Sequence, residues 1–334
     1  MNNNKESFAV KQLIVSSSPH LQSNESISHI MWSVVICLIP ALIGSVYFFG
    51  FRMLLIIGLS VLSALGFEAF AEFMWRRKIT INDGSAVITG ILLAFNLPPN
   101  IPIWIPIIGS GFAVIIVKQI FGGLGNNFIN PALAARAFLM VSWPQLMTTN
   151  WLAPRFGHLA GYDAVTQATP LSLAKNFGTP ETFQSLNSWP VIKNLIIGFR
   201  GGCIGETSAI LLLCGATYLI IKGYLKYRIP LSYIGTILIL SFIFYITKLS
   251  PLSPIFHLFA GGLILGAFFM ATDYVTTPMT VKGQWIFGIG CGVITMLIRL
   301  WGGYPEGVSY SILLMNVATP LIDRYIKPKV FGYK

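Results

Sequence analysis

Charged residues and paired cysteines are scarce in this chain of 334 residues. Aspartate, glutamate, lysine and arginine together make up only 10% of the sequence. The four cysteines are widely spaced and form no C-x-x-C pair, which excludes an iron–sulfur cluster or a zinc site held by this chain alone. A glycine-rich nucleotide-binding fingerprint is also absent. The chain therefore carries no motif for a metal centre or for a nucleotide.

Apolar residues are abundant, at 54% of the sequence, and several runs reach the ~20 residues that a bilayer crossing requires. We therefore predict an all-α integral membrane protein in contact with the lipid bilayer. The first run has no basic segment before it and no small-residue cleavage site after it, which indicates a retained helix. We place about ten spans at 30–51, 53–74, 85–97, 103–121, 131–143, 206–221, 230–248, 254–272, 285–301 and 306–325.

The formal charge of +11 would suggest a nucleic-acid partner in a soluble protein, but here its distribution indicates membrane orientation. With the N-terminus inside, most lysines and arginines, Lys118 among them, lie on the cytoplasmic side. The outside receives only Arg52, Arg155, Lys175, Lys193, Arg200 and Lys248. We expect no nucleic acid, both termini in the cytoplasm, and an extracytoplasmic loop at about 144–205.

Two glycine pairs and two prolines indicate an internal repeat. Pro98 and Gly122-Gly123 recur as Pro278 and Gly302-Gly303, shifted by the same 180 residues. Five spans per half is an odd number, so the halves must cross the bilayer in opposite senses, which predicts an inverted repeat.

This repeat divides the chain into a cytoplasmic segment 1–29, a membrane repeat 30–143, the loop 144–205, a second repeat 206–325 and a cytoplasmic tail 326–334. Short apolar segments at 85–97 and about 260–273 are predicted as broken or re-entrant helices that meet near the bilayer midplane. The alternative is a pair of ordinary short helices ended by proline.

Charged groups within the spans are the next source of information, because stranding one in the bilayer costs ~3 kcal/mol or more. Glu72 precedes Arg76 by one helical turn, which favours a salt bridge between them. Asp83 precedes a short helix, where an N-terminal cap is the simpler role. The candidates for an ion pathway are Asp273, Asp83, Glu68 and Glu206.

A cluster of glycines and asparagines lies at one membrane boundary. Asn126, Asn127 and Asn130 fall within five positions, and Arg136 follows within the next span. Glycines allow a flat ligand to approach the backbone, and asparagine amides can donate and accept at a ring edge. Asn130 also suits the N-cap of a helix that begins at Pro131, although capping does not explain all three asparagines.

The outward loop carries the polar sequence Asp163-Ala164-Val165-Thr166-Gln167-Ala168-Thr169-Pro170. Thr169 followed by Pro170 is typical of a helix N-terminus, so a capping hydroxyl is the simplest interpretation. The tetrapeptide from Thr166 through Ala168 to Thr169 has a second interpretation. A flavin phosphate esterified to a hydroxyl could be tethered here without any nucleotide-binding fold.

The chain resembles, over nearly its whole length, the RnfD family of membrane proteins from the Rnf-type ion-translocating electron-transport complexes, which is related to the NqrB proteins of the sodium-pumping NADH:quinone reductases. The motifs are specific together and not singly. They are Ser18-Pro19-His20, Asp83-Gly84-Ser85-Ala86, Thr89-Gly90, Leu97-Pro98-Pro99, Gly122-Gly123, Asn130-Pro131-Ala132, Arg136-Ala137-Phe138, Ala164 to Leu171, and Gly205-Glu206-Thr207-Ser208. The short N-terminal region favours the Rnf branch.

The resemblance implies FMN attached by a phosphoester to the second threonine of a Ser/Thr-x-Ala-Thr motif, which is Thr169, by a flavin transferase acting outside the cytoplasm. Thr166 stands where serine is common, and the acceptor hydroxyl is kept. A second, noncovalent riboflavin or FMN is implied in the membrane part, and our candidates for its site are Asn126, Asn127, Asn130 and Arg136.

The resemblance also implies a place in a bacterial or archaeal cytoplasmic membrane, beside the other Rnf proteins: further membrane subunits, a second FMN-carrying subunit and iron–sulfur subunits. Electrons would pass between reduced ferredoxin and NAD, coupled to movement of Na⁺ or H⁺. No complete active site is expected in this chain alone. The alternatives are an NqrB-like part of a sodium-translocating NADH:quinone reductase, a transporter or channel without redox activity, and a structural anchor for redox partners.

Overall fold

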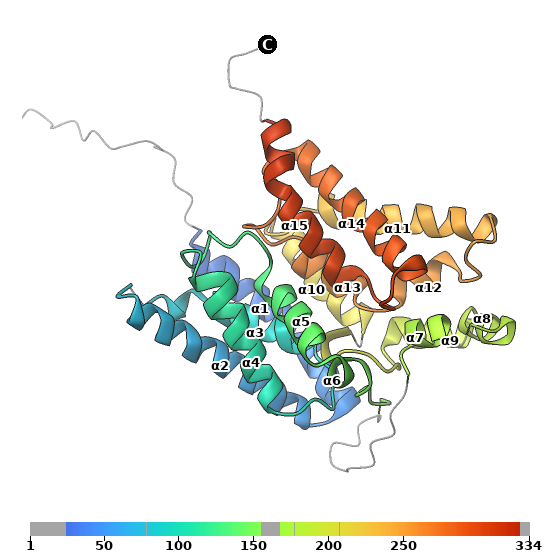
Figure 1. Ribbon diagram of the computed structural model, residues 1–334, viewed down its shortest axis with the longest axis horizontal. Coiled ribbons are helices and arrows are strands. Elements are labelled where there is room, and N and C mark those ends of the chain that lie inside the picture. Colours follow the sequence, from blue (N-terminus) through green and yellow to red (C-terminus); the bar gives the residue numbers. More distant parts are fainter. Residues whose placement is uncertain (1–24, 78, 155–167, 177, 207, 328–334) are drawn as a thin grey trace, which may run out of the picture.

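The computed structural model describes residues 25–77, 79–154, 168–176, 178–206 and 208–327, and within these ranges it contains helices and no β-strand. The first half of the chain forms one group of apolar segments (Figure 1). Their bounds are α1 (Ile27–Phe49), α2 (Arg52–Met74), α3 (Ser85–Phe95), α4 (Trp104–Gly111) continued by the π-helix η2 (Phe112–Gln119), and α5 (Pro131–Ser142). A 3₁₀ turn, η1 (Ile81–Asp83), precedes α3.

The second half forms another such group. Its bounds are α10 (Ala209–Ile221), α11 (Arg228–Ile246), a broken segment made of α12 (Pro254–Phe259), α13 (Leu263–Leu265) and the π-helix η4 (Gly266–Met270), then α14 (Val281–Trp301) and α15 (Val308–Tyr325). Between the halves lie α6 (Pro144–Thr148), α7 (Pro170–Asn176), α8 (Pro180–Leu186), α9 (Trp189–Ile197) and the 3₁₀ turn η3 (Ile204–Glu206).

Four of these helices, α1, α2, α11 and α14, are long and apolar enough to cross a membrane. Their mean hydropathy reaches 2.1, 2.1, 2.1 and 1.5, and no more than 44% of each apolar window is buried within the chain. Large apolar side chains consequently face outward, such as Phe73 on α2 and Ile221 on α10, with exposed fractions of 77% and 79%. Helices that are apolar on all sides belong in a membrane, so the predicted all-α membrane class is confirmed.

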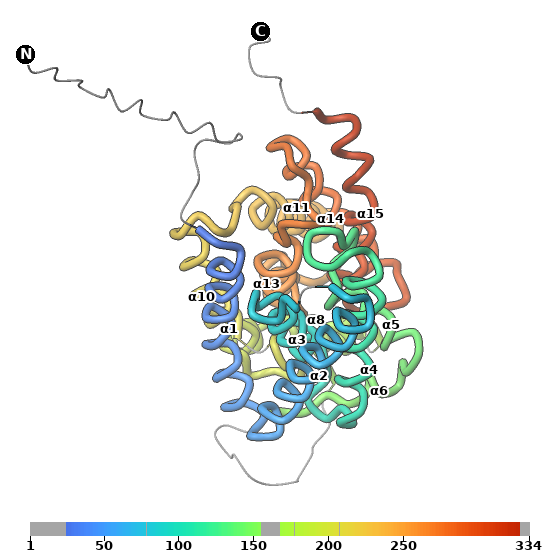
Figure 2. The backbone as a smooth tube through the Cα atoms, turned by 90° about the vertical axis from the view of Figure 1, so that its left-hand side faces the viewer, coloured from blue at the N-terminus to red at the C-terminus, as the bar shows by residue number. Residues whose placement is uncertain are grey.

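Corresponding elements of the two halves pack against each other. Helix α1 packs on α10, and α5 packs on α15, while α2 and α11 pack within their own halves against α3 and α4 and against α14 and α12 (Figures 1 and 2). Contacts between equivalent elements, such as α1 with α10 and α5 with α15, are what an internal two-fold axis between the two halves produces. Four of the ten expected spans coincide with helices that are long and apolar enough to cross a membrane, and the others coincide with other helical segments. The ten-span inverted repeat across a bilayer stays a prediction.

Glycines at the crossings let backbones approach closely. A Cβ on Gly215 of α10 would clash with the carbonyl oxygen of Cys37 on α1, and one on Gly90 of α3 would lie 2.7 Å from the Cα of Val61 on α2. Small residues at such positions allow van der Waals packing between helices in lipid, where no hydrophobic force drives association. These two contacts fix α1 against α10 and α3 against α2.

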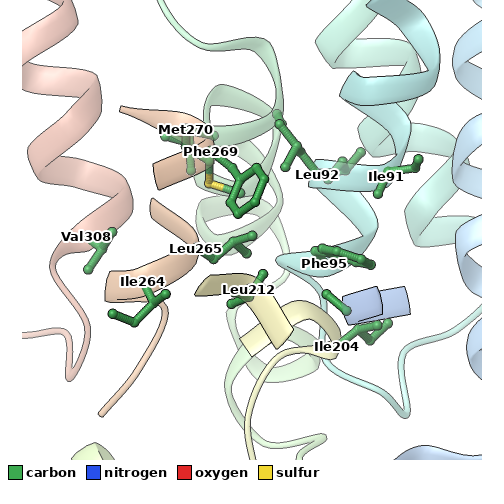
Figure 3. Packing of buried hydrophobic residues seen from close by; sticks show 14 of the residues in the cluster. Ile91, Leu92, Phe95, Ile204, Leu212, Ile264, Leu265, Phe269, Met270 and Val308 are labelled. Atoms are coloured by element: carbon green, nitrogen blue, oxygen red, sulfur yellow. The ribbon is translucent and has the colours of Figure 1, made fainter. Parts of the chain in front are cut away.

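The two short segments meet at the centre of the molecule. The amide nitrogen Nδ2 of Asn96, which ends α3, lies 3.6 Å from the sulfur of Met270, which ends η4. Their apolar side chains join one buried cluster (Figure 3), to which α3 contributes Ile91, Leu92 and Phe95 and the second segment contributes Leu265, Phe269 and Met270. At 1.5 Å per residue α3 is only ~16 Å long, about half of a hydrocarbon core.

The start of α1 and the end of α15 lie toward the same side of the molecule (Figure 2). A chain that crosses a membrane an even number of times has its two ends on the same side. Residues 1–24 and 328–334 of the predicted cytoplasmic regions lie outside the described residues.

Candidate functional site

Thr169 stands directly before helix α7. Its hydroxyl oxygen accepts a hydrogen bond from the Ser172 amide at 3.2 Å and donates one to the Ser172 hydroxyl at 3.0 Å. Pro170 opens the helix, so the predicted capping arrangement is confirmed. Ala168 is exposed, and Thr166 lies outside the described residues. The Thr169 hydroxyl therefore has a structural role, and it also lines a cavity.

This cavity has a volume of about 400 Å³ and is lined by residues of α5, of the α6 and α7 regions and of the second half of the chain; we call it the Thr169 cavity. Aromatic side chains form part of its lining, namely Trp151, Tyr304 and Tyr310. The rings of Tyr304 and Tyr310 stack with centroids 5.2 Å apart and an angle of 24° between planes. A cavity of this size with aromatic walls suits a flat, conjugated ligand.

Arg136 of α5 lies at the floor of the Thr169 cavity and is 5% exposed. One terminal nitrogen donates to the amide oxygen of Asn96 at 2.7 Å, and the other donates to Glu306 Oε2 at 2.8 Å. Glu206 Oε1 lies 3.7 Å from the same guanidinium. Arg136 thus holds α5, the end of α3 and the loop before α15 together through charged contacts.

Arg200, which the sequence analysis placed on the extracytoplasmic side, forms a second buried cation at this cavity. One of its terminal nitrogens donates to the backbone oxygen of Glu206 in η3 at 2.7 Å and to that of Gly261, at the break between α12 and α13, at 3.0 Å. These carbonyls have a buried donor because unpaired backbone groups away from water are costly. Cys203 is also buried here, and burial raises the pKa of its thiol well above the usual value.

Glu306 was missed as a site residue. It follows Gly302-Gly303 in the second half just as Asn126 follows Gly122-Gly123 in the first, so the 180-residue repeat could have marked it. Its Oε1 accepts a hydrogen bond from the Gly262 amide and its Oε2 binds Arg136. The two repeat-related positions therefore carry different chemistry: an exposed amide at Asn126 and a partly buried carboxylate at Glu306.

A second, smaller cavity of about 110 Å³ lies at the start of α5, and we call it the Asn130 cavity. Its lining includes Asn127, Asn130 and Asp273. Asn126 is exposed and does not line it. Arg136 lies six residues further along α5, ~9 Å away at the helical rise, and lines the Thr169 cavity instead. The four residues grouped by sequence are therefore separated: two line the Asn130 cavity, one lines the Thr169 cavity and Asn126 lines neither.

Asn130 caps α5 as predicted, because its Oδ1 accepts from the amides of Ala132 and Leu133 at 3.1 and 3.2 Å. Its Nδ2 also donates to the Met270 carbonyl at 3.3 Å, which ties α5 to η4. Asp273 accepts two weak bonds at 3.4 Å within its own turn, from the Val275 amide and the Thr276 hydroxyl.

Glu68 of α2 is fully buried and forms an ion pair with Lys118 of η2, which is itself 2% exposed. Lys118 was counted among the lysines of the cytoplasmic side, which stays a prediction, and the pairing with Glu68 explains why its charge is buried. Lys118 also donates to the Ser85 hydroxyl at 2.6 Å, and both side chains line the Asn130 cavity. A π-helix at this position is consistent with a functional site, where such helices are enriched.

Glu72 does not pair with Arg76, contrary to the sequence prediction. Its two oxygens accept from the Thr80 amide at 3.0 Å and the Thr80 hydroxyl at 2.5 Å. Helix α2 ends at Met74 and Arg76 adopts a φ of 54°, so the i,i+4 geometry that the pair requires is lost. Asp83 accepts from the Ser85 amide at 2.8 Å at the start of α3, as the capping interpretation predicts.

The fold and these sites define a polytopic, all-helical membrane protein with buried charges between two halves. The chain belongs to the NQR2, RnfD, RnfE family, whose sequence pattern it matches over residues 14–332. The family resemblance indicated by the motifs is therefore confirmed.

Three curated relatives show the range of similarity. The chain is 52% identical over 322 residues to the D subunit of the Na(+)-translocating ferredoxin:NAD(+) oxidoreductase complex of Acetobacterium woodii, covering 96% of this chain and 95% of the relative. It is 50% identical to the D subunit of the proton-translocating ferredoxin:NAD(+) oxidoreductase complex of Clostridium ljungdahlii, covering 95% and 96%. It is 36% identical to the D subunit of the ion-translocating oxidoreductase complex of Aliivibrio salmonicida, covering 96% and 98%.

Proposed function

We propose that the chain is the RnfD-type membrane subunit of an ion-translocating ferredoxin:NAD oxidoreductase complex and carries FMN as a phosphoester on Thr169. The observation that carries this proposal is the position of the Thr169 hydroxyl on the wall of a 400 Å³ cavity with stacked tyrosines and a buried arginine. The full-length similarity to the D subunits of two such complexes supports the same assignment.

The residues around Thr169 fit such a group. The hydroxyl oxygen would form a new bond to the phosphorus of a flavin dinucleotide, a phosphoanhydride bond of that donor would break, and the hydroxyl proton would leave with the departing nucleotide. The Thr169 oxygen makes only a local capping contact to Ser172, so its esterification breaks no contact between elements. The bound flavin supplies electron transfer, while this chain positions it and limits its contact with water.

The walls of the Thr169 cavity suit both the aromatic ring of a flavin and the negative charge that the ring gains on reduction. Tyr304 and Tyr310 offer ring faces to an aromatic system, and Trp151 adds a third apolar surface. Arg136 and Arg200 offer positive charge at the floor, where a ring that gains electrons becomes more negative. A transporter without redox chemistry has no need of this combination next to a hydroxyl.

A second, noncovalent flavin at the Asn130 cavity has less support. Asn127 and Asn130 line that cavity, but at about 110 Å³ it is smaller than the ~300–1,000 Å³ of most ligand sites. Entry of an isoalloxazine ring there requires the lining side chains to move apart. The covalent FMN on Thr169 is therefore the flavin that the geometry supports better.

For the ion pathway we propose the Asn130 cavity, which brings Asp273 near the buried Glu68–Lys118 pair. The transported ion is Na⁺ or H⁺, and the two relatives at 52% and 50% identity carry different ions in their names. The Thr169 loop is proposed to face outward from a bacterial or archaeal cytoplasmic membrane, where a flavin transferase and the other Rnf proteins meet it.

The proposal is tested by electron flux in membrane vesicles that contain the assembled complex and its flavin transferase. We expect Thr169→Ala to abolish ferredoxin-driven NAD reduction and the linked ion uptake. The matched control is Thr149→Ala, which removes a hydroxyl from the lining of the same cavity and should leave both rates near the wild-type values.

Two outcomes contradict the proposal in favour of other classes of protein. Full electron flux in an assembled Thr169→Ala complex would indicate a structural anchor for redox partners. A wild-type band that shows no flavin fluorescence on a denaturing gel, after maturation with the transferase, would indicate a transporter without redox activity.

A further inference from the structure

Two carboxylates, the buried Glu206 and the partly buried Glu306, converge at the Thr169 cavity, which both of them line. A Cβ built on Gly262 would lie 2.7 Å from Glu206 Oε1 and 2.9 Å from Glu306 Oε1, so both oxygens point at the same backbone position. They therefore lie within about 6 Å of each other, the range in which like charges affect each other's ionisation. Any side chain at Gly262 would separate them.

The two carboxylates differ in the number of hydrogen bonds that they accept. Glu306 accepts from the Gly262 amide and from Arg136, whereas Glu206 Oε1 is buried and has no hydrogen-bond partner among the described residues. A buried carboxylate oxygen without a donor is costly when charged, and a proton on it removes that cost. Glu206 also lines the Thr169 cavity, so a proton from the aqueous side can reach it.

The charges around the pair come from several elements. Glu206 and Glu306 face Arg136 from α5, Arg200 and Cys203 from the segment before η3, and Arg299 from α14. With both carboxylates ionised, the three arginines exceed them by one positive charge. A single proton added to the pair raises this excess beside the proposed flavin.

We propose that Glu206 and Glu306 form a proton-binding pair that takes up one proton when an electron enters the Thr169 cavity. This inference rests on the proposed function. The reduced ferredoxin of the complex would supply the electron to the cavity, and an aqueous proton would form the O–H bond at Glu206. No covalent bond in the protein breaks, and both charges leave on reoxidation. The pair thereby keeps the net charge of the cavity constant during electron transfer.

The first test uses flavin-free protein, obtained by expression of Thr169→Ala without the flavin transferase. Infrared difference spectra across a pH titration should show a protonated carboxyl band that disappears as the pH rises. This band should be lost when Glu206→Gln is added, and it should persist with Glu181→Gln, a change of the same type at an exposed glutamate of α8.

The second test uses the flavin-loaded complex. The midpoint potential of the covalent flavin should vary with pH in the wild type. In Glu206→Gln the slope of this potential against pH should be shallower, and should correspond to one proton fewer taken up for each electron. If Glu206→Gln does not assemble, Glu306→Gln removes the other half of the pair and should give the same change in slope. A merely structural role would move the potential without altering its pH dependence.

An unchanged carboxyl band in Glu206→Gln, or an unchanged slope in both glutamine variants, would overturn the inference. These results are separable from failure of the proposed function. Absence of covalent flavin in the wild type would reject the attachment at Thr169, while the infrared test of flavin-free protein would still report whether the pair binds a proton.

Discussion

Individual buried charges in this chain find partners in distant parts of the sequence. Lys118 meets Glu68 across 50 residues, and Arg136 meets Glu306 across 170. Side-chain spacing within one helix predicted the capping roles of Asn130, Asp83 and Thr169, because a cap is made by local geometry. It could not predict the ion pairs, because these depend on how helices pack.

The Glu68–Lys118 pair gives a prediction about stability. Both side chains are nearly fully buried, at 1% and 3% exposed. Lys118→Met or Glu68→Gln alone should destabilise the protein by roughly 3–5 kcal/mol, because each leaves one uncompensated buried charge. The double variant should be far less destabilised than the sum of the two.

Thermal unfolding in detergent, followed for the wild type, the two single variants and the double variant, measures this coupling. Additive losses across the four proteins would show that the two groups do not act as a pair. A matched control is Lys222→Met, which removes an exposed lysine at the end of α10.

Elements of this chain follow from its hydropathy, and their breaks follow from glycine and proline. The expected spans at 53–74 and 131–143 became α2 at Arg52–Met74 and α5 at Pro131–Ser142, because long apolar runs leave few alternatives and Asn130 with Pro131 marks the start of α5. A broken helix was predicted at about 260–273, but its exact division into α12, α13 and η4 could not be predicted from hydropathy. It depends on Arg200, which binds the carbonyls freed at the break.

Helix crossings at glycine give the second prediction. Gly215→Ala should lower the unfolding temperature, because its Cβ would clash with the Cys37 carbonyl and α1 must move away from α10. The control is Gly235→Ala in the interior of α11, where nothing in the described part of the chain lies within 4 Å. That change should be neutral or stabilising, since alanine favours a helix over glycine by ~1 kcal/mol. Equal unfolding temperatures for the two variants would contradict this packing.

For the molecule as a whole, the pattern of lysine and arginine predicts an orientation that the helices alone do not give. We expect Gln184, exposed on α8, and Lys327, exposed after α15, to lie on opposite sides of the membrane. Single cysteines at these positions, in a background without the native four, should react with an impermeant thiol reagent from opposite sides.

Labelling of Gln184→Cys only from the cytoplasmic side would reverse the orientation, and an extracytoplasmic flavin would then be excluded. Cys214 must be removed for this experiment because it is exposed on α10. Cys203 is less reactive, since burial raises the pKa of its thiol and keeps it protonated.

The central claim is that FMN is bound to the Thr169 oxygen, and peptide mass spectrometry of protein matured with its flavin transferase tests it most directly. We expect an FMN adduct on the peptide that contains Thr169, a reduced yield in Thr169→Ser because a hydroxyl is kept, and no adduct in Thr169→Ala. The control Thr149→Ala should retain the full adduct. An FMN adduct on Thr169→Ala would contradict the account and would direct attention to Thr166.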